Sequence, residues 1–199
     1  MSARETRICV VGDELAAAVG DPRALGWVGR VLANTKFDRP NMVFTLPVPG
    51  EASLGLSKRW EDETASRFSR EPDVDNRLVV ALGRHDIGSG QSVARSRLNL
   101  ANILDVAASR RIPAFVVGPP PGRHEDGPAI AELSAAYGDV AERRRVRYVD
   151  TYTPLAGHEQ WLTDLGQSRS VYPGQAGYGL IAALVLNAGW RTWLGLPEN

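Results

Sequence analysis

The stretch RICVVGDELAAAVGD, residues 7–21, decides the fold because its character changes at one point. Residues 7–12 are apolar after Arg7 and rich in β-branched side chains, which is typical of a strand buried on both faces. The strand runs into Gly12 and Asp13. Glu14 follows, at the carboxyl end of the strand, and functional sites of parallel sheets gather at such ends.

Similar short apolar runs recur along the chain and alternate with segments of helical spacing. The further strands are expected at 42–48, 77–83, 112–118 and 146–150, and the clearest helices at 91–110, 128–144 and 174–194. Five strands alternating with helices predict an α/β fold: a three-layer α/β/α sandwich with a five-stranded parallel sheet, similar to flavodoxin. The length of 199 residues fits a single domain spanning 1–199.

Composition excludes several classes of function. The net charge is zero and the pI is about 6.8, so we expect no nucleic-acid partner and no anionic-lipid surface. No apolar run approaches the length of about 18 residues that a membrane span needs. The polar N-terminus does not resemble a signal peptide, so we expect a cytoplasmic protein. The single cysteine, Cys9, lies inside the first strand and is expected to be buried.

Four blocks at the expected strand ends resemble the GDSL/SGNH hydrolase family of esterases and lipases. They are VVGDELAAAVGDPRALGWVGRV (10–31), FTLPVPGEASLGLSKRW (44–60), ALGRHDIG (81–88) and VYPGQAGYGLIA (171–182). The resemblance covers almost the whole chain and implies the SGNH hydrolase fold. It also implies a site assembled from all four blocks.

In that family a serine attacks the ester, a histidine is its base, and an aspartate three residues earlier orients the histidine. A glycine N–H and an asparagine amide help to hold the oxyanion. The resemblance carries these five roles, in the order serine, glycine, asparagine, aspartate and histidine, onto Glu14, Pro47, His85, Arg169 and Tyr172. All five positions differ from the family pattern, so we predict no catalytic residue that works by the family mechanism.

The substituted residues do not suit serine chemistry. A carboxylate is a poor nucleophile towards an ester, and a tyrosine with an ordinary pKa near 10 is a weak base at neutral pH. Proline has no N–H to donate to an oxyanion. Our first hypothesis is therefore a pseudoenzyme that acts by binding or assembly, through an unknown small ligand, a protein partner or a homo-oligomer.

Two other functions stay open. One is an active hydrolase or acyltransferase that cleaves an ester or a carbohydrate-linked acyl substrate with Glu14 and His85 as base and acid. The other is a purely structural role in a complex. We expect no cofactor.

Several side chains are candidates for a binding site at the former catalytic position. They are Asp13, Glu14, His85, Asp86, Arg169 and Tyr172. We expect Glu14 to pair with Arg169 or to accept from Tyr172, because a buried carboxylate needs a partner. Asp13 and Asp86 are expected to brace the loops by accepting backbone N–H bonds. Glu14, His85 and Asp86 are also possible metal ligands, but we predict no metal site.

Other conspicuous residues have a structural interpretation. The proline-rich segment 119–128 is expected to be a surface loop. We expect His124 and His158 on the surface, and the five tryptophans in the core. The tryptophans are Trp27, Trp60, Trp161, Trp190 and Trp193.

Overall fold

Five parallel strands form the centre of the molecule in a computed structural model that describes residues 4–123 and 127–197. The strands are β1 (Glu5–Gly12), β2 (Asn41–Pro47), β3 (Val74–Ala81), β4 (Ala114–Val117) and β5 (Arg147–Val149). Their order across the sheet is β2-β1-β3-β4-β5. Every neighbouring pair is parallel, and Gly12 lies in register with Pro47 on one side and Ala81 on the other. This confirms the predicted fold class.

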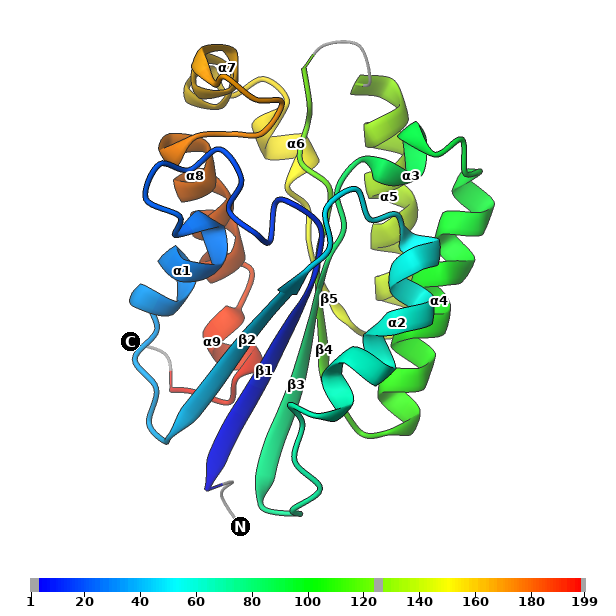
Figure 1. Ribbon diagram of the computed structural model, residues 1–199, viewed down its shortest axis with the longest axis vertical. Coiled ribbons are helices and arrows are strands. Elements are labelled where there is room, and N and C mark those ends of the chain that lie inside the picture. The colour runs from blue at the N-terminus through cyan, green and yellow to red at the C-terminus, as the bar shows by residue number, and fades with distance from the viewer. Residues whose placement is uncertain (1–3, 124–126, 198–199) are drawn as a thin grey trace.

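Helices cover both faces of the sheet (Figure 1). One layer holds α1 (Gly26–Ala33), α8 (Gln175–Asn187) and α9 (Trp190–Trp193), and the other holds α2 (Ser53–Ala65), α4 (Val93–Ser109) and α5 (Gly127–Arg143). Three further helices lie beyond the carboxyl ends of the strands: α3 (His85–Gly88), α6 (Tyr152–Leu155) and α7 (Glu159–Gln167). Among the described residues, none of these helices combines the length and apolarity needed to cross a bilayer.

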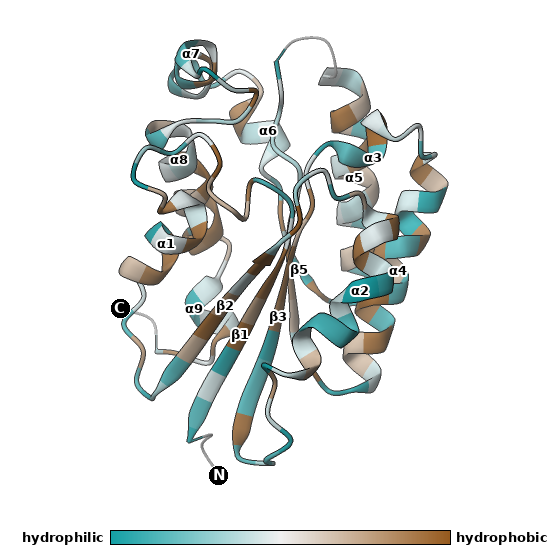
Figure 2. Ribbon diagram, viewed as in Figure 1, coloured by the Kyte–Doolittle hydropathy of each residue, from teal (hydrophilic) through white to brown (hydrophobic). Residues whose placement is uncertain are grey.

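Two apolar cores lie on either side of the sheet, because successive side chains of a strand point to opposite faces. In β1, Ile8 and Val10 face the layer of α1 and α8, whereas Cys9 and Val11 face the layer of α2 and α4. Figure 2 shows the carboxyl-terminal parts of the strands as hydrophobic. Cys9 is fully buried, as expected. Four of the tryptophans are fully buried, and Trp193 is partly buried.

Some boundaries differ from those expected. The segment 174–194 is two helices, because Gly189 adopts a left-handed conformation (φ +85°) that ends α8 and begins α9. The strand expected at 77–83 runs instead from Val74 to Ala81. Residues 82–83 leave the sheet at its carboxyl edge, and that turn directs the next residues towards the site.

The start of the proline-rich segment is buried, and its end is helical, so these described parts are not the surface loop that composition predicted. Pro119, Pro120 and Pro121 are buried, and Gly127 and Pro128 already belong to α5. Proline has a compact apolar ring, so it can pack inside the molecule where no backbone donor is needed. His158 is exposed, as expected, and His124 lies outside the described residues.

Candidate functional site

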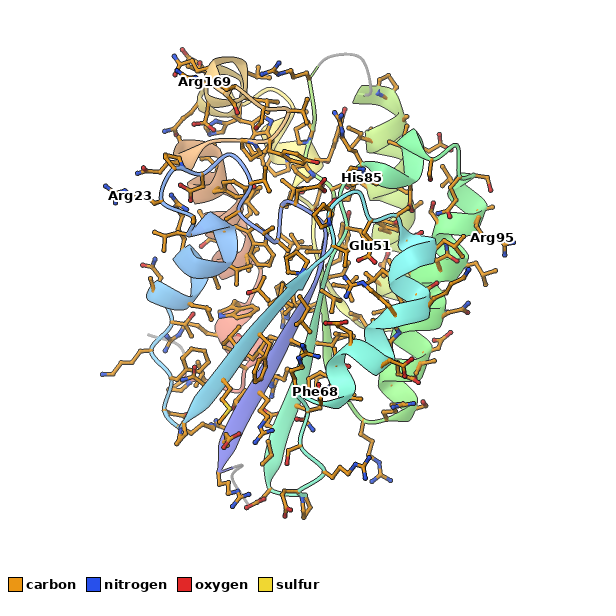
Figure 3. All side chains as sticks on the ribbon, viewed as in Figure 1. Arg23, Glu51, Phe68, His85, Arg95 and Arg169 are labelled. Atoms are coloured by element: carbon orange, nitrogen blue, oxygen red, sulfur yellow. The ribbon has the colours of Figure 1, made fainter. Side chains whose placement is uncertain are left out.

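The carboxyl ends of β1, β2 and β3 meet at one edge of the sheet, and the loops that follow them build the candidate site. Glu14 follows β1, Gly50 lies between β2 and α2, and His85 opens α3 after β3. Tyr172 arrives from the segment before α8. Figure 3 labels His85 at this edge, above the sheet and between the two helical layers.

The Glu14 carboxylate is the centre of this cluster, and its side chain is only 13% exposed. The backbone N–H of Gly50 donates to Oε1 at 2.9 Å, and His85 Nε2 lies 2.8 Å from Oε2. An ionised carboxylate can only accept, so Nε2 of His85 carries a hydrogen and donates it to Oε2. The Tyr172 hydroxyl lies 3.4 Å from the same nitrogen. Glu14 therefore holds the ends of three loops together.

Gly50 can present its N–H to Glu14 because of its backbone conformation. Its φ of +73° lies in the left-handed region, which glycine adopts readily and other residues adopt at a free-energy penalty. The backbone N–H of Val48 still donates to the Gly12 carbonyl at 2.8 Å, so the loop leaves the sheet only at Pro49, directly before Gly50. A glycine is needed here to aim the donor at the site.

The pKa shifts of Glu14 and Tyr172 follow from this geometry. Partial burial opposes ionisation of Glu14. Hydrogen bonds from its own backbone N–H, from Tyr172 and from His85 outweigh that effect and lower its pKa. Burial raises the pKa of Tyr172 well above its ordinary value, and the adjacent Glu14 carboxylate raises it further. At neutral pH the cluster is a carboxylate that accepts hydrogen bonds from a neutral phenol and an imidazole.

Asp13 supports the cluster from beneath. Its side chain is buried and accepts backbone N–H bonds of 3.0 Å from Leu15 and from Gly83. It thereby ties the loop after β1 to the loop after β3, as predicted. His85 Nε2 lies 3.9 Å from Asp13 Oδ2. Burial raises the pKa of Asp13 to about 6 despite these hydrogen bonds.

Asp86 also braces a loop, but it points away from Glu14. Its Oδ1 accepts the Ser53 backbone N–H and its Oδ2 accepts the Tyr137 hydroxyl, each at 2.5 Å. Asn99 adds a 3.0 Å hydrogen bond to the Ser53 hydroxyl. This buried network fixes the start of α2 against α4 and α5. The expected bracing role of Asp86 is confirmed, and both of its carboxylate oxygens are bonded to Ser53 and Tyr137 rather than to Glu14 or His85.

Two of the expected site residues do not contact Glu14. Arg169 is exposed, has no ion pair among the described residues, and lies beside α7, well away from His85 in Figure 3. The predicted Glu14–Arg169 pair is therefore wrong, and His85 takes that place. Pro47 ends β2 in register with Gly12, and the N–H that reaches Glu14 comes from Gly50, three residues later. The assignment of the donating position to Pro47 is therefore wrong.

Sequence reasoning missed two contributors that the structure reveals. The sequence could have indicated Gly50, because this glycine lies in a loop that directly follows a strand. No sequence pattern indicates the role of Asp164. Its carboxylate accepts N–H bonds from Gly174, Ala176 and Gly177, which anchors the first turn of α8 and the segment that carries Tyr172. Only the tertiary contact between α7 and α8 identifies that role.

Asp13, Glu14 and His85 are the described residues whose donor atoms could hold a cation. The three ligand atoms lie within 4.8 Å of one another. This set contains Asp13 in place of the Asp86 considered from the sequence. Hydrogen bonds within the protein already satisfy these groups, because Asp13 accepts two backbone N–H bonds and Glu14 pairs with His85. The absence of a metal stays a prediction.

The cluster has a very small cavity on one side and a large open groove on the other. The cavity beside Tyr172 is lined by Arg84, Pro120 and Trp161 among others, and its volume is only about 20 Å³, close to that of a single water. An open groove of about 760 Å³ lies on the other side of Gly50, between residues 48–55 and 89–95. Of these two spaces, the groove is the one with room for a ligand larger than water.

Comparisons with known proteins agree with this architecture. Residues 10–180 match the model of the GDSL-like lipase/acylhydrolase family. The lipase/acylhydrolase from Enterococcus faecalis superposes with a TM-score of 0.74 at 20% identity, over 98% of each chain. An acetylxylan esterase from Geobacillus stearothermophilus gives 0.71 at 15% identity, over 97% of each chain.

A psychrotrophic esterase from Pseudoalteromonas sp. gives a TM-score of 0.70 at 20% identity, over 95% of this chain and 98% of that one. At such identities the structures show a shared fold. No curated protein sequence matches the chain. The family match spans most of the sequence and the fold agrees with it, so the chain belongs to the GDSL-like lipase/acylhydrolase family.

Proposed function

We propose that this family member does not hydrolyse esters by the serine mechanism and acts in the cytoplasm by binding. The observation that carries the proposal is the 2.9 Å hydrogen bond from the Gly50 N–H to Glu14 Oε1. An oxyanion hole works only if its donors await the charge that develops in the transition state. Here the Gly50 N–H already donates to the charged carboxylate of Glu14, so it is not available to a substrate carbonyl.

The rest of the cluster supports the same conclusion. Residue 14 has no hydroxyl, and Tyr172, with its raised pKa, does not accept a proton at neutral pH. The cavity of about 20 Å³ beside Tyr172 has no room for an acyl group. We therefore place the ligand or protein partner in the groove beside Gly50, where Val48 and Leu54 expose apolar surface.

An assay for ester hydrolysis tests the proposal. p-Nitrophenyl acetate and butyrate are incubated with a high concentration of the protein, beside the Glu14→Ala variant. We expect both proteins to match the buffer rate. Saturable turnover that disappears in the variant would show that the proposal is wrong.

Restoring the family residues gives a positive control. The variant Glu14→Ser, His85→Asn, Arg169→Asp and Tyr172→His should gain measurable turnover, because Gly50 still supplies the backbone donor. Adding Pro47→Gly should not increase it further, since the N–H that reaches residue 14 comes from Gly50. A folded quadruple variant without activity would mean that the loops have also changed.

A second candidate function rests on the Glu14–His85 pair. A carboxylate 2.8 Å from an imidazole is the arrangement that orients a general base, and His85 Nδ1 has no partner among the described residues. This pair would activate water or an acyl acceptor against an ester or a carbohydrate-linked acyl group. The p-nitrophenyl ester assay separates the two functions. If the Glu14–His85 pair is catalytic, the wild-type protein turns over the ester, and both Glu14→Ala and His85→Ala abolish that turnover.

A further inference from the structure

A second groove lies at the amino-terminal end of the parallel strands, whereas Glu14 lies at their carboxyl-terminal end. It is formed where α4 turns into β4 and α5 turns into β5, at the amino ends of those strands (Figure 1). Its volume is about 440 Å³. Three arginines line it, Arg111, Arg145 and Arg147, and none of its ten lining residues is acidic. The chain has no net charge, so this is a local concentration of positive charge.

Two of these arginines have no partner within the described part of the chain. No hydrogen bond or ion pair involves the side chain of Arg111 or Arg145 there. Their sequence neighbours are paired, since Arg110 contacts Glu61 at 2.6 Å and Arg144 contacts Asp105 at 2.7 Å. Two arginines without a partner among the described residues therefore line the same groove.

The backbone at these two positions is also unusual. Arg111 and Arg145 have φ values of +59° and +55°, and each follows the last turn of a long helix. Glycine is the usual residue there, because a Cβ atom makes the left-handed conformation unfavourable. Both turns carry an arginine despite that penalty, and both arginines reach the same groove.

We propose that this groove binds a small organic phosphate monoester. Guanidinium groups match phosphate oxygens with paired hydrogen bonds, and a dianion complements several arginines. Arg147 already donates one N–H to the Ala188 carbonyl at 3.0 Å, which fixes its position. Ile112, Pro113 and Trp193 provide an apolar wall for the organic part of the ligand. The volume exceeds what inorganic phosphate needs and suits a small organic molecule.

Calorimetric titration with adenosine monophosphate and with phenyl phosphate tests the proposal. We expect one-to-one binding of at least one of them, weaker binding of inorganic phosphate, and none of adenosine. Arg111→Gly and Arg145→Gly should each weaken binding by about tenfold or more, since each removes a charged hydrogen-bond donor. Each should also raise the Tm of the free protein by about 2–4 °C, because glycine relieves the left-handed conformation.

Arg110→Ala is the matched control. It removes the same charge one residue away, outside the groove, so binding and Tm should change little. Glu14→Gln should bind the phosphate normally, which separates this groove from the proposed function. No saturable binding at about 1 mM of either monoester would overturn the proposal. Equal binding by the glycine variants, or binding of single-stranded DNA alone, would also overturn it.

Discussion

Replacing Glu14 by glutamine tests whether its carboxylate holds the three loops together. Glutamine keeps the shape and can still accept from the Gly50 N–H, but it loses the charge. Its amide nitrogen also cannot accept the hydrogen that His85 donates to Oε2. Hydrogen bonds to a charged group contribute about 1.5–3 kcal/mol, and neutral ones about 0.5–1.5 kcal/mol. For two such bonds we expect a loss of about 2 kcal/mol at pH 7.

The stabilising effect of Glu14 should depend on pH in a definite direction. The folded-state pKa of Glu14 lies below its ordinary value of 4.5. Its stabilising effect is therefore fully present above pH 4.5 and is lost as the pH falls through the lower folded-state value. The difference in unfolding free energy between wild type and Glu14→Gln should be largest near neutrality and shrink in acid.

Thermal and urea unfolding, followed by circular dichroism at several pH values, measure the difference. A loss of about 2 kcal/mol corresponds to a Tm lower by about 4–8 °C for a chain of this length. Glu132→Gln is the control, because Glu132 is exposed and should change stability by less than about 0.5 kcal/mol. The reasoning fails if Glu14→Gln matches wild type at pH 7, or if its deficit persists unchanged at the lowest pH.

Three further predictions concern the groups around Glu14. Gly50→Ala should lower stability by about 1–2 kcal/mol in urea unfolding, because its φ of +73° penalises a Cβ atom; an unchanged midpoint would contradict this. The pKa of Asp13 is about 6 in the fold and 3.8 ordinarily, so its ionisation removes stability as the pH rises between these values. Relative to Asp13→Asn, wild type should lose about 2 kcal/mol from pH 4 to pH 7, and a constant difference would be evidence against the raised pKa. Tyr137→Phe leaves one oxygen of the buried Asp86 carboxylate without its hydroxyl donor, and should cost about 1–3 kcal/mol in the same unfolding assay. A Tyr137→Phe loss below about 0.5 kcal/mol would show that this bond is dispensable.

Several features of the molecule could be predicted from the sequence because they depend on local pattern. Buried parallel strands are apolar along their whole length, so the five strands were recognisable, and their alternation with helices specified the layers. The residues that follow strands were expected at one edge, and Glu14 and His85 do meet there. The bracing roles of Asp13 and Asp86 followed from the preference of aspartate for nearby backbone N–H groups.

Only the tertiary structure decided which side chains meet at the site. Arg169 and Tyr172 are three residues apart, yet one is exposed and the other contacts the cluster, because the segment before α8 is not periodic and its path depends on Asp164. The backbone donor comes from Gly50 rather than Pro47 because a loop's path depends on its φ angles, and residue identity constrains those angles only loosely. Pattern determines elements, whereas long-range packing determines the contacts between loops.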